Sequence, residues 1–170
     1  MKSLMMFLIL SFFFLMSHHA MADEKLITTT CTQTPYKQLC VSSLKSDNRS
    51  SRADTAGLAL ILVDKISTKT KLAIKIVTQR VKSTKDPKVV EALKQCSGLY
   101  NAVMVADVPM ATEALTKGDP KFAEQGAVDA SNEVESCEAG FPKGTSPVSG
   151  LNREIGQLAA VVASITKQLE

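Results

Sequence analysis

The chain has 170 residues, of which 45% are hydrophobic and 5% aromatic, and its formal net charge is +3 at pH 7. This length suits one domain with a sizeable core, and the predominance of helix-forming residues over aromatic ones favours an all-α fold. The near balance of charges, without a dense basic run interleaved with aromatic residues, argues against a nucleic-acid partner.

The beginning of the chain has the pattern of a secretory signal peptide. Lys2 precedes an apolar run from Leu4 to Met16, and Ala20-Met21-Ala22 fits a signal-peptidase site. We therefore expect a signal peptide over residues 1–22 and a mature domain over residues 23–170. The apolar run is too short to span a bilayer, and no later segment is long and apolar enough to do so. The sequence thus predicts a soluble protein of the secretory route, with no membrane segment after cleavage.

Both histidines of the chain, His18 and His19, lie in the segment that would be removed. Without histidine, a serine or cysteine nucleophile lacks its usual base, and a transition-metal site lacks its commonest ligand. Phosphate-binding loops, zinc signatures and dinucleotide fingerprints are absent too. Glu133 and Glu135 are two positions apart on a predicted helix and face different directions, so we interpret them as surface charges. We expect a binding protein rather than an enzyme, with no metal and no cofactor.

The missing histidines also bear on pH dependence. If the affinity for a partner decreases as pH rises from about 5 to 8, the responsible proton must sit on a carboxylate whose pKa is raised in the complex, such as an acid of the partner.

Four cysteines, Cys31, Cys40, Cys96 and Cys137, lie in the mature part of the chain. In an oxidising compartment they predict two disulfides, for which three pairings exist. Cys31 precedes a short predicted helix whose second turn holds Cys40, so a local bridge would pin a hairpin and leave Cys96 to pair with Cys137. A metal site on these cysteines is disfavoured because neither histidine nor a Cys-x-x-Cys spacing accompanies them.

The first predicted helix after the signal peptide is short. Thr34-Pro35 has the pattern of an N-cap followed by a first helical residue, which predicts a helix as far as about Lys45. A polar run then breaks this helix. The run contains the sequon Asn48-Arg49-Ser50, so Asn48 is a candidate N-glycosylation site whose occupancy the sequence leaves open.

Two long helices follow, each with an apolar stripe at spacings of three and four. The first is predicted from Ala53 to Val81, and the lysines at positions 65, 69, 71 and 75 occupy its other faces, where we interpret them as a solvated surface rather than an anion site. Asp86-Pro87 supplies the N-cap and the first residue of the second helix. The stripe residues are Ala59, Leu62, Ile66, Thr70, Ala73, Val77 and Val81 on the first helix, and Val89, Leu93, Cys96, Tyr100 and Val103 on the second.

Two further long helices are predicted after a short helical piece over about Pro109–Lys117, which ends at Gly118. Asp119-Pro120 restarts the chain as N-cap and first residue of the third helix, and Ser146-Pro147 repeats this pattern before the last one. The inward positions are Ala123, Ala127, Ala130, Val134 and Cys137 on the third helix, and Leu151, Ile155, Leu158, Val162, Ile165 and Leu169 on the last.

These elements predict an up-and-down antiparallel four-helix bundle over residues 53–170, preceded by a small disulfide-pinned helical hairpin over residues 23–52. Cys96 and Cys137 each lie on the inward stripe of a bundle helix, which independently supports a bridge between two packed helices. Alternation with a period of two is nowhere sustained, so no strand is expected.

The start of the third bundle helix has an unusual composition. Phe122 is one position off the inward stripe, and its own face continues through Gly126, Asp129 and Glu133, which we expect to be a solvent face. Lys121 puts a positive charge beside the positive end of the helix dipole, which is mildly unfavourable. An exposed aromatic residue next to a cation favours a contact with a partner. The alternative is a phenylalanine that caps the end of the bundle beside a solvated lysine.

Several of these residues together resemble the plant invertase and pectin methylesterase inhibitor family. Besides the Cys96 and Cys137 pair, three segments carry the resemblance, which spans essentially the whole mature chain. They are Cys31-Thr-Gln-Thr-Pro-Tyr-Lys-Gln-Leu-Cys40, Ala53-Asp-Thr-Ala-Gly-Leu-Ala59 and Leu115-Thr-Lys-Gly-Asp-Pro-Lys-Phe-Ala-Glu124. The cysteines do not choose between the two activities of the family. Pro120-Lys121-Phe122 does, because it resembles the motif by which the invertase-inhibitor branch enters the active site of its target.

The resemblance implies an inhibitor of acid invertase (β-fructosidase) that binds its target through Pro120, Lys121 and Phe122 in a one-to-one complex and is a monomer when free. It also implies Cys31–Cys40 and Cys96–Cys137 pairing, and a location in the apoplast, at the cell wall, or in the vacuole. Two alternatives stay open. A pectin methylesterase inhibitor would cover the cleft of its enzyme with a helix face, and a secreted carrier of apolar ligands belongs to a class that is usually richer in cysteine.

Overall fold

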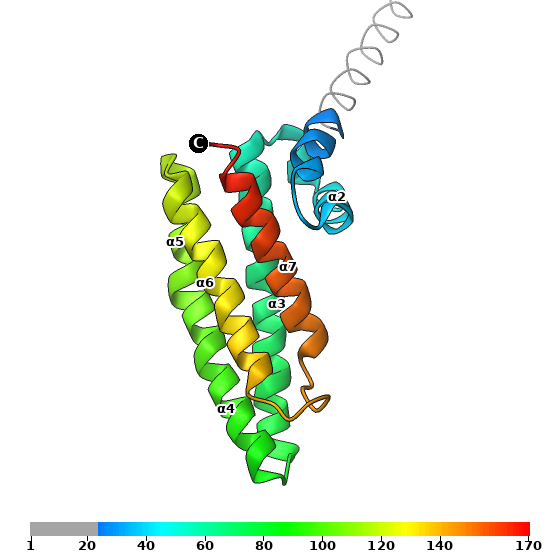
Figure 1. Cartoon of the computed structure of the whole chain (residues 1–170), viewed down its shortest axis with the longest axis vertical. Helices are drawn as coiled ribbons and strands as arrows, with labels where there is room; N and C mark the ends of the chain where they lie inside the picture. The colour runs from blue at the N-terminus through cyan, green and yellow to red at the C-terminus, as the bar shows by residue number, and fades with distance from the viewer. Residues whose placement is uncertain (1–23) are drawn as a thin grey trace, which may run out of the picture.

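The computed structural model describes residues 24–170. The signal peptide expected over residues 1–22, with His18 and His19, lies outside the described residues. Within the described part all regular structure is helical, and none of its helices is long and apolar enough to cross a membrane. The helices form an elongated bundle with a helical hairpin beside one end (Figure 1).

The bundle is built from four antiparallel helical rods, as predicted. The second rod combines three consecutive segments. The rods are α3 (Thr55–Ser83), α4 (Pro87–Ala102) with η2 (Val103–Asp107) and α5 (Val108–Lys117), α6 (Pro120–Ala139), and α7 (Ser149–Thr166). α3 packs against α4, α5 and α7, and α6 packs against the same three helices, so α3 and α6 lie at opposite corners of the bundle cross-section.

The predicted apolar stripes form the core of the bundle. Every predicted stripe position of α3 is buried except Val81, which is partly buried near the end of the helix. The Cys96–Cys137 disulfide joins α4 to α6 and confirms the predicted pairing. Tyr100 lies beside this bridge, fully buried, and its hydroxyl donates a hydrogen bond to Asn152 of α7. The phenol therefore adds a polar tie between two rods without leaving a buried polar atom unpaired.

Three aspartates begin bundle helices. Asp54 accepts a hydrogen bond from the Gly57 N–H at 2.8 Å, and Asp86 and Asp119 cap α4 and α6 as predicted. Each side chain satisfies an N–H that has no partner within its helix.

Two predicted helix starts are wrong. α2 (Lys37–Lys45) begins two residues after Pro35, because the Thr34 hydroxyl donates to the Cys31 carbonyl at 2.8 Å and closes the preceding helix instead of capping the next. α7 begins at Ser149, after Val148 at the N-cap position, so Ser146-Pro147 belongs to the loop.

The prediction of a separate helical piece over Pro109–Lys117 is also wrong, because α5 continues α4 without a break through the π-helical segment η2. Pro109 has no N–H, and its ring clashes with the carbonyl four residues earlier. The helix widens by one π turn directly before the proline and then continues, which accommodates the proline without ending the rod.

The N-terminal hairpin consists of a helix over residues 24–32, α2 and the 3₁₀ helix η1 (Asn48–Arg52). The Cys31–Cys40 disulfide joins its two arms, as predicted. Polar contacts contribute to its attachment to the bundle. The Ser164 hydroxyl of α7 donates to the Gln33 carbonyl at 2.9 Å.

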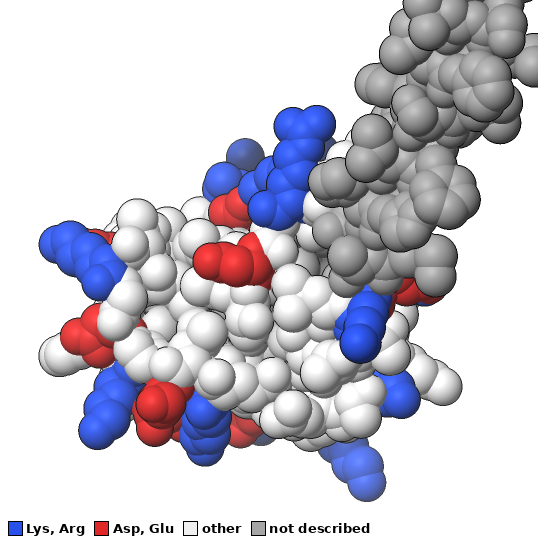
Figure 2. Space-filling model, turned by 90° about the horizontal axis from the view of Figure 1, so that it is seen from above, with Lys and Arg blue, Asp and Glu red and all other residues white. Residues whose placement is uncertain are grey.

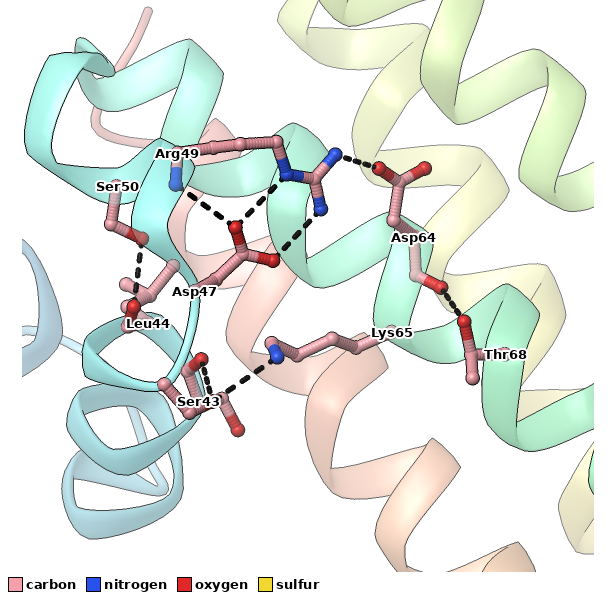
Figure 3. A network of polar contacts seen from close by, with 9 residues as sticks. Ser43, Leu44, Asp47, Arg49, Ser50, Asp64, Lys65 and Thr68 are labelled. Carbon is pink, nitrogen blue, oxygen red and sulfur yellow. Dashed lines mark hydrogen bonds and ion pairs between the residues drawn. The ribbon is translucent and has the colours of Figure 1, made fainter.

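A second attachment of the hairpin is an ion-pair network (Figure 3). The Arg49 guanidinium lies between the Asp47 carboxylate of the hairpin and the Asp64 carboxylate of α3. The hydrogen bond from Arg49 lowers the pKa of Asp47 to about 2. Because Arg49 and Asp64 are largely solvent-exposed, the network fixes the position of η1 more than it stabilises the fold.

Candidate functional site

The turn between α5 and α6, at the upper end of the bundle in Figure 1, has a sharply defined geometry. Gly118 adopts φ 76°, a left-handed conformation that ends α5 and that side chains other than glycine rarely take. The Asp119 N–H donates to the Ala114 carbonyl at 2.8 Å, and the Asp119 carboxylate accepts from the Phe122 N–H at 3.3 Å. Pro120 is the first residue of α6. These contacts hold residues 118–122 in one conformation, which we call the α5–α6 corner.

Two large side chains project from this corner. Phe122 is 61% exposed, and Lys121 is exposed and forms no ion pair with any residue in the described range. The neighbouring Lys117 is instead paired with Glu113 on α5. The arrangement leaves Lys121 as an available cation beside an exposed aromatic ring. Neither side chain is needed to complete the core.

Phe122 also lines a surface cavity of about 410 Å³ between the last turns of α5 and the corner. Met110 and Ala114 form its apolar side, and the Glu113–Lys117 pair lies at its edge. Figure 2 looks down on this end of the molecule, where uncharged residues make up much of the surface and lysine and arginine side chains project mainly from its rim. The corner therefore offers an apolar contact area together with one unpaired cation.

The face of α6 below Phe122 was expected to be exposed to solvent, and this is wrong at Gly126. Gly126 is buried against the second rod, where an added Cβ atom would lie 2.7 Å from the Asp107 carbonyl oxygen and 3.0 Å from the Ala111 nitrogen. A glycine at this position lets α6 approach η2 and α5 closely. The contact fixes the angle between the two helices that meet at the corner.

Asp107 is a notable residue that the sequence analysis missed. This residue of η2 is only 5% exposed, and its Oδ2 atom has no hydrogen-bond partner among residues 24–170. Burial, together with the nearby carboxylates of Asp129 and Glu133 on α6, raises its pKa to about 6. The signal available in the sequence was an acidic residue in an otherwise apolar segment just before Pro109.

The remaining candidate residues lie away from the corner. Asn48 is exposed on η1, whereas Ser50 of the same sequon is buried and its hydroxyl donates to the Leu44 carbonyl at 2.8 Å. A glycan at Asn48 thus stays a prediction, and it would have to be added before the hairpin folds. Glu133 and Glu135 lie on α6, and no group of three or more metal-ligating side chains occurs among residues 24–170.

Comparison with known proteins identifies the family of this chain. Residues 25–165 match the family model described as plant invertase/pectin methylesterase inhibitor. The chain belongs to this family of inhibitors. As a member of the invertase/pectin methylesterase inhibitor family it is an inhibitor and not an enzyme, and the family implies a target enzyme that is either an invertase or a pectin methylesterase.

Two relatives and one solved structure illustrate the breadth of the family. The chain is 42% identical over 144 residues to the cell wall / vacuolar inhibitor of fructosidase 1 of Arabidopsis thaliana, which covers 85% of this chain and 69% of the relative. It is 30% identical over 120 residues to a pectinesterase inhibitor of Actinidia deliciosa, covering 71% and 64%. A crystal structure of a mutant pectin methylesterase inhibitor from Arabidopsis has a TM-score of 0.74 at 19% identity, covering 85% of this chain and 97% of that one. This last likeness establishes the fold.

Proposed function

We propose that this protein inhibits acid invertase by placing Pro120, Lys121 and Phe122 in the active site of the enzyme. The observation that supports this most directly is the α5–α6 corner, which presents an unpaired lysine and an exposed phenylalanine on a fixed turn. The relative named as a cell wall / vacuolar inhibitor of fructosidase supports the same target class.

The chemistry of the target explains why a lysine suits this position. A retaining fructosidase uses a carboxylate nucleophile and a carboxylic acid to cleave its glycosidic bond. The Lys121 ammonium, at the end of a four-carbon stem, can reach such a carboxylate cluster. Phe122 would cover the apolar or sugar-stacking wall beside it, and Pro120 would fix the direction of approach. Sucrose is then excluded from the site.

The same proposal includes the stoichiometry and the location. One α5–α6 corner per chain corresponds to a one-to-one complex, and a chain whose bundle buries its own apolar stripes is expected to be monomeric when free. The two disulfides fit a secreted protein. We place it in the apoplast, at the cell wall, or in the vacuole, consistent with the name of its Arabidopsis relative.

A pectin methylesterase inhibitor is the second candidate, because one relative at 30% identity carries the name pectinesterase inhibitor. In that case a helix face would cover the enzyme cleft, and Lys121 would have no special role. The carrier hypothesis has less support, since the inward side chains of the bundle are buried against one another.

A parallel titration separates these candidates. Purified acid invertase and purified pectin methylesterase would each be titrated with the mature protein at mildly acidic pH, with sucrose hydrolysis and methyl-ester release as the two readouts. We expect stoichiometric inhibition of invertase and none of pectin methylesterase. Inhibition of pectin methylesterase alone would replace our proposal with the second candidate.

A further inference from the structure

Charge is strongly segregated along this chain. Residues 65–94 contain nine lysines and arginines and two acidic residues, a formal charge of +7. Residues 107–138 contain two lysines and eight acidic residues, a formal charge of −6. The small net charge of the whole chain hides this separation. Four lysines of the first segment, at positions 65, 69, 71 and 75, are those interpreted from the sequence as a solvated surface rather than an anion site.

The two segments lie on different sides of the molecule. Residues 65–94 form the second half of α3 and the first half of α4, which meet at the lower end of the bundle in Figure 1. Residues 107–138 comprise the last residue of η2, α5, the turn after it and nearly all of α6, and α6 lies at the corner of the bundle opposite to α3. The bundle therefore has a basic side on α3 and an acidic side on α6.

Five exposed lysines of the first segment lie along α3 and through the turn into α4, and we call them the basic strip. Positions 71, 75 and 82 lie on one face of α3 because they are four and eleven residues apart, which spans about 16 Å along the helix. Position 85 lies in the turn after α3, and position 88 lies in the first turn of α4. The members are Lys71, Lys75, Lys82, Lys85 and Lys88, and all are exposed.

The fold does not neutralise this strip. None of its lysines forms an ion pair with a residue of the described part, whereas Lys69, on another face of α3, pairs with Glu154. The nearest acidic side chain in sequence, Asp86, already accepts the Lys88 N–H as the N-cap of α4. Like charges at helical neighbours repel one another. An external polyanion would relieve this repulsion.

The composition of the strip indicates the kind of polyanion. It consists of lysines, which act as point charges, and it contains no aromatic residue on which a base can stack. Arg80, the arginine of this segment, is two positions from Lys82 and therefore lies on another face of α3, so the strip offers no bidentate phosphate contact. Three of its positions follow one face of α3 lengthwise, which suits an extended chain that carries single charges along its length. We propose that the basic strip binds an acidic polysaccharide of the polyuronate type, one carboxylate per sugar, in the compartment to which the protein is secreted.

This surface is separate from the proposed invertase contact. The strip begins on the opposite side of the bundle from α6 and continues to the end away from the α5–α6 corner. A polyuronate chain on the strip would leave Lys121 and Phe122 free, so the protein could be retained on a matrix and still reach its enzyme. The inference requires only secretion and does not depend on which enzyme is inhibited.

The test uses the mature protein and two forms of one polymer, polygalacturonate and its fully methyl-esterified form, each immobilised on a resin. We expect retention on polygalacturonate at low ionic strength, release by salt, and no retention on the ester, since counterion release accompanies neutralisation of a polyanion. The variant Lys75→Gln, Lys82→Gln, Lys85→Gln should bind at least about tenfold more weakly, with a shallower salt dependence.

A matched control removes three positive charges elsewhere. Lys25→Gln, Lys37→Gln, Arg153→Gln changes exposed residues outside the strip and lowers the net charge equally, so binding should stay within about twofold of the parent. Circular dichroism and enzyme inhibition should be the same in all three proteins. The proposal is overturned if the parent is not retained or if both variants lose binding equally. It is also overturned if duplex DNA or anionic lipid vesicles bind the strip as tightly as polygalacturonate does.

Discussion

At the scale of single residues, the proposed inhibition of invertase is tested most directly at Lys121, because its ammonium has no ion-pair partner within the described part of the chain. We expect Lys121→Ala to weaken invertase inhibition at least about tenfold, or about 1.4 kcal/mol. The helical circular-dichroism signal and the melting temperature should be unchanged, because the side chain contributes nothing to the core. Lys37→Ala, which removes an exposed lysine from the hairpin, is the matched control. Equal inhibition by parent and Lys121→Ala would contradict the proposed role of the corner.

Asp107 gives a prediction about stability. Its native pKa of about 6 lies above its ordinary value of 3.8, so between about pH 4 and 6 the folded chain binds more protons than the unfolded chain. The stability of the fold therefore decreases as pH rises through this window, by at most about 3 kcal/mol, and stays lower above it.

The variant Asp107→Asn tests this, since an amide does not titrate. We expect it to melt at a higher temperature than the parent at pH 7 and at a similar temperature near pH 4, followed by circular dichroism. A difference in melting temperature that is the same at both pH values would mean that Asp107 does not titrate in this range.

At the scale of elements, the contact of α6 with η2 and α5 determines how the corner is held. Gly126→Ala would place a methyl group 2.7 Å from the Asp107 carbonyl oxygen and force the helices apart. We expect a loss of about 1–3 kcal/mol of stability and weaker inhibition, because the corner would shift with α6. Gly98→Ala on α4 is the control, since an added Cβ there meets nothing within 4 Å, and the greater helix propensity of alanine should leave stability equal or slightly higher. Similar melting temperatures for Gly126→Ala and the parent would show that the close approach is not required.

The two disulfides should differ in their contribution. Cys96–Cys137 joins two bundle helices across the core, so its removal should cost about 2–5 kcal/mol. Cys31–Cys40 closes only the hairpin, whose contacts with the bundle include exposed polar ones, so its removal should lower the melting temperature of the bundle less. Paired serine substitutions, each compared with the parent by thermal melting, measure the two effects. A larger loss from the hairpin pair would contradict this ranking.

The elements also show what the sequence could and could not predict. The stripes, the Asp86 and Asp119 caps and the Gly118 terminus follow from local patterns, and the structure confirms them. The rest depends on tertiary context. A proline predicts a break, but neighbouring helices on both sides kept α4 and α5 in one rod, with a π turn before Pro109. The burial of Gly126 and of Asp107 follows from that same interface, which no local pattern contains. Lys121 and Phe122 could be selected from sequence because they depart from the pattern of their own helix.

At the scale of the whole molecule, the uneven distribution of charge along the chain bears on how binding to the enzyme depends on pH. The proposed contact places Lys121 within a segment that has a formal charge of −6. Three of its carboxylates lie at the corner, where Glu113 and Glu124 are paired with Lys117 and Lys167 and Asp119 caps α6. A carboxylate-lined active site docked on Lys121 would come close to these groups. Carboxylates brought together in this way have raised pKa values, because each charge disfavours ionisation of its neighbours.

The inhibitor should therefore take up protons when it binds the enzyme. Carboxylates at the interface should be protonated below their raised pKa values in the complex, so the complex is most stable in acid and weakens as pH rises through those values. Calorimetry near pH 6, in buffers of different ionisation enthalpy, should then report a net uptake of protons on binding. The uptake should persist in Asp107→Asn, because Asp107 is buried between the two rods of the inhibitor and not at the corner. If affinity falls with rising pH while protons are released or none are exchanged, the pH dependence has another origin. If Asp107→Asn abolishes the uptake, the titrating group is Asp107 inside the inhibitor. The affinity for the enzyme would then depend on the protonation of a buried group of the inhibitor and not on carboxylates at the interface.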